Sequence, residues 1–244
     1  MTVKKKIVLV TGANKGIGFE IATQLGRTGA IIYIGARDKL RGVEAVNRLR
    51  TEGIDARFTL LDVTDAATVQ STAEIVRDAH GVLDILVNNA GLIDPHDGPP
   101  SGIDLEVLRR TFETNFFGAA LVAREMLPYL RESDAGRIVN ISSGLGSLAL
   151  NEDPSWAFAD TKLIAYNASK AALNMLTVQL AWELRDTNIK VNSANPNFTE
   201  TDLVPGVEGA QPVEAGAITA IELALLADNG PTGGFFERGE HLPW

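Results

Sequence analysis

The sequence predicts an α/β fold, a doubly wound parallel sheet with helices on both of its faces. Apolar runs typical of buried strands alternate with helical patterns, and a glycine-rich turn links the first strand to the first helix. Polar residues follow several of the strands, and ligands bind at the carboxyl ends of the strands in such sheets. With 244 residues, 45% of them hydrophobic, the chain is expected to form one domain over residues 1–244.

The alternation places each element in order. Strands are expected at residues 7–10, 31–36, 56–61, 83–87, 137–141, 190–194 and 232–236. Helices are expected at residues 19–29, 39–50, 66–80, 105–130, 166–185 and 213–226, the fourth of them bent near Gly118 and Pro128. Two turn-rich segments are expected beside the site: residues 94–102, and residues 199–212, interpreted as a substrate lid rather than an ordinary long connection.

A glycine-rich turn follows the first strand, with the sequence Thr11-Gly12-Ala13-Asn14-Lys15-Gly16-Ile17-Gly18. Gly12 allows a tight turn, Gly16 lets a backbone approach a pyrophosphate, and Gly18 lets the helix pack closely on the strand. The helix that follows offers free N–H groups and a positive dipole end to phosphates. Strand, turn and helix together predict a nucleotide-binding Rossmann fold, with the spacing G-x-x-x-G-x-G rather than the commoner G-x-G-x-x-G.

The end of the second strand indicates which nucleotide is bound. An acidic residue there would hold a ribose 2′-hydroxyl, but the chain reads Ala36-Arg37-Asp38, with Arg41 one turn further. Arg37 and Arg41, with Lys15 in the turn, could surround a 2′-phosphate, because the planar guanidinium suits bidentate phosphate binding. We therefore favour NADP(H) over the alternative in which Asp38 holds the ribose of NAD. The plainer interpretation, solvated charges at a helix start, applies most to Arg41.

Tyr166 and Lys170 lie four residues apart in a helical pattern, so they share one helix face. A phenol with a pKa of ~10 is a poor acid at neutral pH, and a neighbouring ammonium favours the phenolate. At ~4 Å and an effective dielectric of ~20 the attraction is ~4 kcal/mol, or ~3 pKa units. Lys170 is therefore expected to bring the pKa of Tyr166 near 7, where the phenol can exchange a proton with a carbonyl oxygen. Alone, this spacing is usual on a solvated helix face, so the glycine turn decides the interpretation.

Six further motifs follow the glycine turn. They are Leu61-Asp62-Val63, Asn88-Asn89-Ala90-Gly91, Asn115 in a central helix, Ile141-Ser142-Ser143, Tyr166-Asn167-Ala168-Ser169-Lys170 and Asn195-Pro196-Asn197-Phe198-Thr199. Over about residues 5–234 the chain resembles the short-chain dehydrogenase/reductase family, and within it the NADPH-dependent carbonyl reductases. Each motif is common by chance, whereas the whole set in order is not.

The resemblance implies reversible hydride transfer between NADP(H) and a small-molecule carbonyl or alcohol. Tyr166 would exchange the proton, Ser143 would hydrogen-bond the carbonyl oxygen, and the neighbouring Ser142 would face away from the cleft. The implied catalytic residues are Asn115, Ser143, Tyr166 and Lys170. The implied cofactor-binding residues are Gly12, Asn14, Lys15, Gly16, Ile17, Gly18, Arg37, Arg41, Asp62, Val63, Asn89, Ala90, Gly91, Tyr166, Lys170, Pro196 and Thr199.

Two departures from the family pattern bear on this interpretation. Asn197 stands where the family has glycine, and asparagine is the next most tolerant residue if that position needs a positive φ. Ser143 and Tyr166 lie further apart than is common in the family, because about residues 150–163 are inserted between them. This segment is expected either to close over the substrate or to disturb the helix pairing that would form a homodimer or homotetramer. Within it, Phe158 and Lys162 repeat the Tyr–Lys spacing, but phenylalanine has no hydroxyl to transfer a proton.

The sequence does not name the substrate. Apolar residues are expected to line its pocket and to favour a hydrophobic aldehyde or ketone; they are Leu92, Ile93, Leu145, Trp156, Phe158 and Leu203. Two alternatives stay open: a non-catalytic nucleotide-binding sensor or scaffold of the same fold, and a dehydratase or epimerase that uses the same residues.

Composition argues against several other classes. A net charge of −9 argues against a nucleic-acid partner and is expected of a cytoplasmic protein. The chain has no cysteine and three scattered histidines, so disulfides, thiol catalysis and a metal site are not expected. Membrane association is not expected either, because no apolar run is long enough to span a bilayer and the run after Lys4-Lys5-Lys6 is too short for a signal peptide.

Overall fold

The computed structural model describes residues 5–203, 206 and 208–244. Within these residues one sheet has the strand order β3-β2-β1-β4-β5-β6-β7-β8. The strands are β1 (Ile7–Thr11), β2 (Ile31–Ala36), β3 (Ala56–Leu60), β4 (Ile85–Asn88), β5 (Arg137–Ile141), β6 (Lys190–Ala194), β7 (Phe235–Glu237) and β8 (Glu240–His241). All neighbouring strands run parallel except β7 and β8, which form an antiparallel hairpin. The order reverses at β1, between β2 and β4, and this is where ligands bind in doubly wound sheets.

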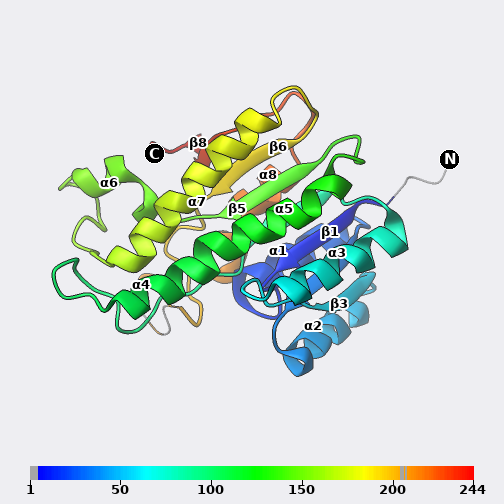
Figure 1. The fold of residues 1–244 in the computed structure, drawn as a ribbon, viewed down its shortest axis with the longest axis horizontal. Coiled ribbons are helices and arrows are strands. Elements are labelled where there is room, and N and C mark those ends of the chain that lie inside the picture. The colour runs from blue at the N-terminus through cyan, green and yellow to red at the C-terminus, as the bar shows by residue number, and fades with distance from the viewer. Residues whose placement is uncertain (1–4, 204–205, 207) are drawn as a thin grey trace.

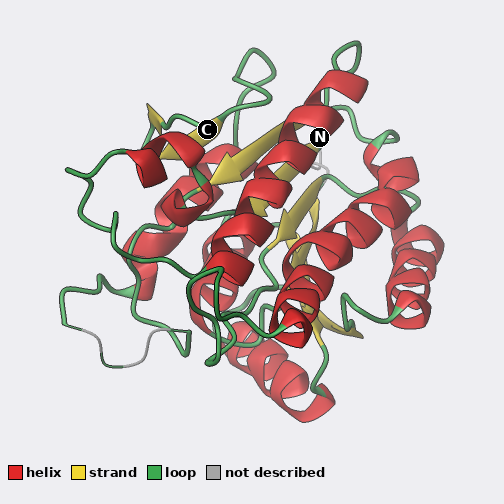
Figure 2. Cartoon of the chain, turned by 60° about the vertical axis from the view of Figure 1, so that its left-hand side comes forward, coloured by secondary structure: helices red, strands yellow, loops and turns green. Residues whose placement is uncertain are grey.

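Helices cover both faces of the sheet (Figures 1 and 2). They are α1 (Gly16–Arg27), α2 (Lys39–Thr51), α3 (Ala66–His80), α4 (Leu105–Phe112), η1 (Glu113–Gly118), α5 (Ala119–Leu130), η2 (Gly144–Gly146), α6 (Leu148–Glu152), α7 (Ile164–Glu183) and α8 (Val213–Ala224). None of the helices in the described part of the chain is both long and apolar enough to cross a membrane.

The alternation of side chains along β1 builds two separate cores, because successive strand residues face opposite sides of a sheet. Val8 and Val10 pack with α1, α2 and α8 in one core. Ile7 and Leu9 pack with α3, α5 and the end of α7 in the other. All five residues of β1 are buried, as expected for a central strand covered on both faces. The predicted α/β doubly wound fold is confirmed.

The central helical run over residues 105–130 departs from the prediction of a simple bend. It is interrupted by η1, a π-helical turn that ends at Gly118, and Pro128 lies inside α5. A Cβ at Gly118 would lie 2.7 Å from Val63 Cγ2, so only glycine lets this turn approach the segment after β3. The wider turn includes Asn115, which lies buried between the neighbouring loops.

Other boundaries differ by a few residues. β4 begins at Ile85 rather than at residue 83, α7 covers 164–183 rather than 166–185, and the last predicted strand becomes the β7–β8 hairpin. The predicted lid over residues 199–212 includes residues 204, 205 and 207, which lie outside the described residues. At its two ends, Thr199 and Gln211 form an isolated parallel bridge.

The Thr11 hydroxyl ties the end of β1 to the segment after β4. Its Oγ1 accepts hydrogen bonds from Asn89 N and Ala90 N, both at 3.0 Å, and donates to Val87 O at 3.5 Å. Thr11 is buried, so water cannot replace these bonds without opening the structure. This hydroxyl group, together with the Asn89 side chain, therefore holds the glycine turn and the Asn89–Gly91 segment side by side.

Replacing Thr11 with valine keeps the shape of the side chain but leaves two N–H groups without an acceptor. We expect Thr11→Val to lower the free energy of unfolding by about 2–3 kcal/mol, measured by denaturant titration. Thr11→Ser keeps the hydroxyl, so its free energy of unfolding should fall clearly less. Equal losses in the two variants would show that the methyl group, not the hydroxyl, stabilises this junction.

Candidate active site

The glycine turn adopts the conformation for which glycine is needed at two positions. Gly12 and Gly16 have φ values of 64° and 57°. A Cβ at Gly12 would lie 3.0 Å from Ala90 Cα, and a Cβ at Gly18 would lie 2.4 Å from Asn89 Nδ2. The sequence assigned Gly18 to close packing of helix on strand; its nearest neighbour is instead the Asn89 side chain, which donates to Thr11 O at 2.9 Å.

The start of α1 has the features of a phosphate cradle. Its N-cap residue, Lys15, makes no side-chain capping hydrogen bond, and the first turn of α1 contains no acidic residue. A Cβ at Gly16 would meet only Thr201 Cγ2, at 3.8 Å, so space lies open beside this turn. Uncapped N–H groups, a positive helix end and open space together fit the pyrophosphate of a dinucleotide. Asn14 and Ile17 are partly exposed in the same turn.

The basic residues near this cradle have different partners. Lys15 forms an ion pair with Asp202, and hydrogen bonding and charge from Lys15 lower the pKa of that carboxyl. Arg41 pairs through Nε with Asp38 Oδ2 at 3.5 Å, and Asp38 Oδ1 also accepts from Arg41 N at 3.1 Å as the N-cap of α2. Arg37 is exposed, and no ion pair within the described residues includes it.

Asp62 and Val63 follow β3 at the same edge of the sheet. Asp62 Oδ1 accepts from Thr64 N at 3.0 Å and from Thr64 Oγ1 at 2.8 Å, so the carboxylate stabilises its own turn. Val63 is buried against Gly118. The backbone of Asp62 and Val63 thus follows β3, which β2 separates from β1 and the glycine turn.

A loop far away in sequence fixes the start of the helix that carries Tyr166. Asp97 Oδ1 accepts from Ala165 N at 3.0 Å, and Asp97 Oδ2 accepts from Tyr166 N at 2.8 Å. Gly98 O accepts from Ile164 N at 3.0 Å. The side chain of Asp97 therefore supplies the cap that the local sequence of α7 lacks. The sequence placed residues 94–102 beside the site, but it did not single out Asp97.

Tyr166 and Lys170 lie on one face of α7, with the Lys170 Nζ 5.6 Å from the centre of the Tyr166 ring. Lys170 is buried, and its Nζ donates to Ile141 O at 2.7 Å. A Cβ at Gly91 would lie 3.5 Å from Lys170 Nζ and 3.4 Å from Asn115 Oδ1. The ammonium, the Asn89–Gly91 segment and Asn115 thus meet in one place.

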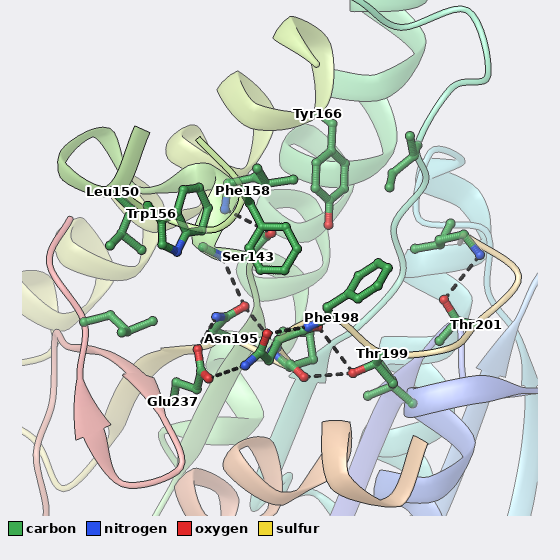
Figure 3. Close-up of a pocket in the computed structure, with 18 residues that line it drawn as sticks. Ser143, Leu150, Trp156, Phe158, Tyr166, Asn195, Phe198, Thr199, Thr201 and Glu237 are labelled. Atoms are coloured by element: carbon green, nitrogen blue, oxygen red, sulfur yellow. Dashed lines mark hydrogen bonds between the residues drawn. The ribbon is translucent and has the colours of Figure 1, made fainter. Parts of the chain in front are cut away.

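Ser143 and Tyr166 line the same cavity, and the Tyr166 hydroxyl points into it (Figure 3). Ser143 follows β5, and its Oγ accepts from Leu145 N at 3.2 Å. Ser142 faces the opposite side, where its Oγ donates to Asn174 Oδ1 at 2.6 Å. The expectation that only one of these two serines faces the cleft is confirmed.

Burial changes the acidity of this pair in a direction that the sequence did not predict. Burial raises the pKa of Tyr166 to about 12, and the Ser143 hydroxyl opposes this rise. Burial also lowers the pKa of Lys170 to about 8. The predicted fall of the Tyr166 pKa to near 7 is wrong for the cofactor-free protein. The ammonium lies over the ring and bonds to Ile141 O, so its attraction does not offset the cost of burying a phenolate.

Asn115 is held by three hydrogen bonds. Its Oδ1 accepts from Leu92 N at 2.8 Å, and its Nδ2 donates to Leu92 O and to Ser169 Oγ, both at 3.0 Å. The side chain therefore joins η1, α7 and the loop after β4. Leu92 was expected to line the pocket; it lies outside the lining, and its backbone is engaged with Asn115 instead.

The segment after β6 adopts the conformation expected from the family's glycine. Asn197 has a φ of 59°, which asparagine tolerates better than most residues do. Thr199 is buried, and its Oγ1 donates to Pro196 O at 2.8 Å. Both Pro196 and Thr199 line the cavity that contains Ser143 and Tyr166.

The cavity has a volume of about 280 Å³ and a mostly apolar wall. Five of the expected residues line it: Ile93, Leu145, Trp156, Phe158 and Leu203. Trp156 and Phe158 come from the inserted segment, which therefore forms part of the cavity wall. Several other residues that were not predicted to line the cavity do so, namely Leu150, Asn195, Phe198, Thr201, Glu237 and Leu242. Glu237 and Leu242 lie beyond residue 234, where the family resemblance ends.

Comparisons with known proteins agree with this geometry. The model of the short chain dehydrogenase family matches residues 6–211. Carbonyl reductase [NADPH] 1 from Mus musculus is 32% identical, with all of both chains covered, and carbonyl reductase [NADPH] 3 from the same organism is 36% identical over 91% of each chain. An NADPH-bound carbonyl reductase from chicken fatty liver superposes with a TM-score of 0.85 at 25% identity, covering 99% of this chain and 100% of that one.

A nucleotide-binding Rossmann fold, with a glycine-rich turn near a group of Ser, Tyr and Lys side chains, is typical of nucleotide-dependent oxidoreductases. The family model matches most of the chain, and this match shows that the protein belongs to the short-chain dehydrogenase/reductase family.

The burial of Lys170 predicts a measurable titration in the cofactor-free protein. We expect its ammonium to lose its proton near pH 8, because burial lowers its pKa from 10.5 to about 8. Between these two values the unfolded chain binds more protons, so the contribution of Lys170 to stability rises with pH in that window. Heteronuclear NMR of the lysine side chains, assigned with Lys170→Met, measures the midpoint. A midpoint near 10.5 would contradict the assignment.

Proposed function

We propose that this protein is an NADPH-dependent reductase of ketones and aldehydes that acts by reversible hydride transfer. One observation carries the proposal: the hydroxyl groups of Ser143 and Tyr166 share a cavity with Ile17 of the glycine turn and with Pro196 and Thr199. A carbonyl group in that cavity would meet two hydroxyl groups beside the expected dinucleotide site. The mostly apolar wall supports a hydrophobic carbonyl compound as the substrate.

The residues of this chain would divide the binding of the cofactor among them. The first turn of α1 would hold the pyrophosphate, the backbone of residues 89–91 and of Pro196 would line the nicotinamide end, and Lys170 would face the ribose. When bound, NADPH would supply the hydride. Among the described residues Lys170 Nζ has Ile141 O as its hydrogen-bond acceptor, which leaves further N–H donors for ribose hydroxyls.

Proton transfer would be the work of Tyr166. Because burial raises its pKa to about 12, the phenol keeps its proton at neutral pH, and it would give that proton to the developing alkoxide oxygen, which is more basic than the phenolate. Ser143 would orient that oxygen by donating a hydrogen bond, and the charge of Lys170 would favour the phenolate left behind. Asn115, fixed by three hydrogen bonds, would keep η1 and α7 in register around the lysine.

The arrangement of charges favours NADPH over NADH. Asp38, the residue that would hold a ribose 2′-hydroxyl, already caps α2 and pairs with Arg41. Arg37 and Lys15 lie in the segments that flank the cradle, and both can bind a phosphate. The alternative of a non-catalytic sensor is disfavoured, because Ser143 and Tyr166 line one cavity and Lys170 lies next to the Tyr166 ring, so a complete set of reactive side chains is present.

Replacing Tyr166 with phenylalanine removes the proton donor and keeps the ring. We expect Tyr166→Phe to lower kcat for ketone reduction by a factor of about 10² or more, while NADPH still binds. NADPH oxidation followed by absorbance measures the first quantity, and the change of cofactor fluorescence on binding measures the second. Near-normal turnover in the variant would rule out Tyr166 as the acid.

Reversing the charge of Arg37 tests the choice of cofactor. We expect Arg37→Glu to raise KM for NADPH at least about tenfold more than KM for NADH, because a charge-assisted bond to phosphate is lost. Arg77→Glu makes the same charge change near the end of α3, away from the carboxyl ends of the strands, and should leave the ratio of the two KM values unchanged. An unchanged ratio in Arg37→Glu would remove this arginine from the phosphate site.

A further inference from the structure

A carboxylate borders the otherwise apolar cavity. Glu237 ends β7, and its side chain lines the cavity beyond Asn195 as seen from the Tyr166 hydroxyl (Figure 3). Among the described residues that line this cavity, Glu237 is the one with a formal charge at neutral pH. A charged group in an apolar wall is costly unless a partner compensates it, so its partners need to be identified.

The hydrogen bonds of Glu237 leave its charge uncompensated. Oε2 accepts from Asn195 Nδ2 at 2.6 Å and Oε1 accepts from Asn197 Nδ2 at 2.5 Å. These amides are neutral, and no ion pair within the described residues includes Glu237. Each carboxylate oxygen can accept two hydrogen bonds, so each keeps one free position. The side chain is therefore held in place and still able to bind a cation.

The amide network around Glu237 explains why it cannot move away from the cavity. Asn195 Oδ1 accepts from Gly144 N at 3.1 Å and from Asn197 N at 3.2 Å. A flip of the Asn195 side-chain amide would break both hydrogen bonds. Gly144 follows Ser143 directly. The carboxylate is thus anchored to the same backbone segment that positions the proposed carbonyl-binding serine.

Three aromatic rings stand on the same cavity wall. Trp156 and Phe158 meet edge to face with 5.5 Å between their centroids, and Phe158 and Phe198 lie 5.7 Å apart. Trp156 packs over Gly144, where a Cβ would lie 3.0 Å from its ring. Aromatic faces attract organic cations, and the attraction grows when the cation leaves water. Rings and a fixed carboxylate in one cavity are the features of a site for an alkylated ammonium group.

We propose that the substrate of this site is a hydrophobic ketone or aldehyde that carries a protonated amine. The carbonyl oxygen binds at Ser143 and Tyr166, and the ammonium group binds at Glu237 and the rings of Trp156, Phe158 and Phe198. This inference rests on the proposed reductase function. The amine takes no part in the reaction: the carbonyl carbon gains a hydride, its oxygen gains the Tyr166 proton, and the ammonium keeps its charge.

The test uses matched pairs of aryl ketones. In each pair a dimethylammonium group on an alkyl chain is replaced by an isopropyl group of the same shape, and the series varies the length of the chain. At neutral pH with NADPH, we expect kcat/KM for at least one ammonium ketone to exceed that of its neutral partner by about tenfold or more. The readout is this ratio within a pair, which cancels any general change in turnover.

Glu237→Gln keeps the shape of the side chain and one oxygen that can accept from an asparagine, but it removes the charge and replaces the other acceptor with an NH2 donor. We expect the ratio to fall to about one in this variant. Glu240→Gln is the matched control: it removes one negative charge from the same β7–β8 hairpin outside the cavity, and it should keep the wild-type ratio. Phe158→Leu keeps an apolar side chain but removes the central ring, and it should lower the ratio as well.

A binding measurement separates this inference from the reductase function. The ammonium compound without its carbonyl group should bind to the cofactor-free protein in calorimetry, and Glu237→Gln should weaken that binding about tenfold. If neutral ketones are reduced with no preference for an amine, the inference fails and the reductase function stands. If no ketone is reduced but the amine still binds through Glu237, the reductase function fails, and the assignment of the substrate falls with it although the ammonium-binding site stands. If Glu237→Gln lowers kcat/KM equally for the ammonium ketone and for its neutral partner, Glu237 only orders the asparagines. That result would overturn the inference.

Discussion

Lys170 places a buried ammonium where three parts of the chain meet. Helix α7 carries it, β5 accepts its hydrogen bond at Ile141 O, and the loop after β4 lies against it at Gly91. The cost of burying this charge lowers its pKa to about 8 and the same burial raises that of Tyr166 to about 12. Burial, and not mutual attraction, therefore sets both pKa values, so a ligand that changes the burial of both groups would change the acidity of both.

The fold could be predicted because its causes are local. Val8 and Leu9 face opposite cores, and because both faces of β1 are buried the strand is visible in the sequence as a continuous apolar run. Asp38 and Asp65 cap α2 and α3 where the pattern of side chains begins. The π-helical turn could not be predicted, since it depends on Gly118 approaching Val63, a contact between residues far apart along the chain.

The residues of the site also fall into two groups: those that short sequence patterns predict and those that depend on long-range packing. The glycine turn and the Tyr166–Lys170 spacing are short patterns, and the structure brings these residues to one edge of the sheet. The cap that Asp97 gives to α7 and the position of Glu237 in the cavity wall arise from long-range packing. The pKa of Tyr166 belongs to this second group, because spacing along a helix reveals a neighbour but not how far water is excluded.

The ion pair of Lys15 with Asp202 joins the nucleotide turn to the segment after Thr199. Both side chains are about half exposed or more, so the pair can exchange partners readily. A nucleotide phosphate that reaches Lys15 has to displace a carboxylate already bound there. One anion would then replace another at this lysine, and the Lys15–Asp202 pair would no longer join the two segments.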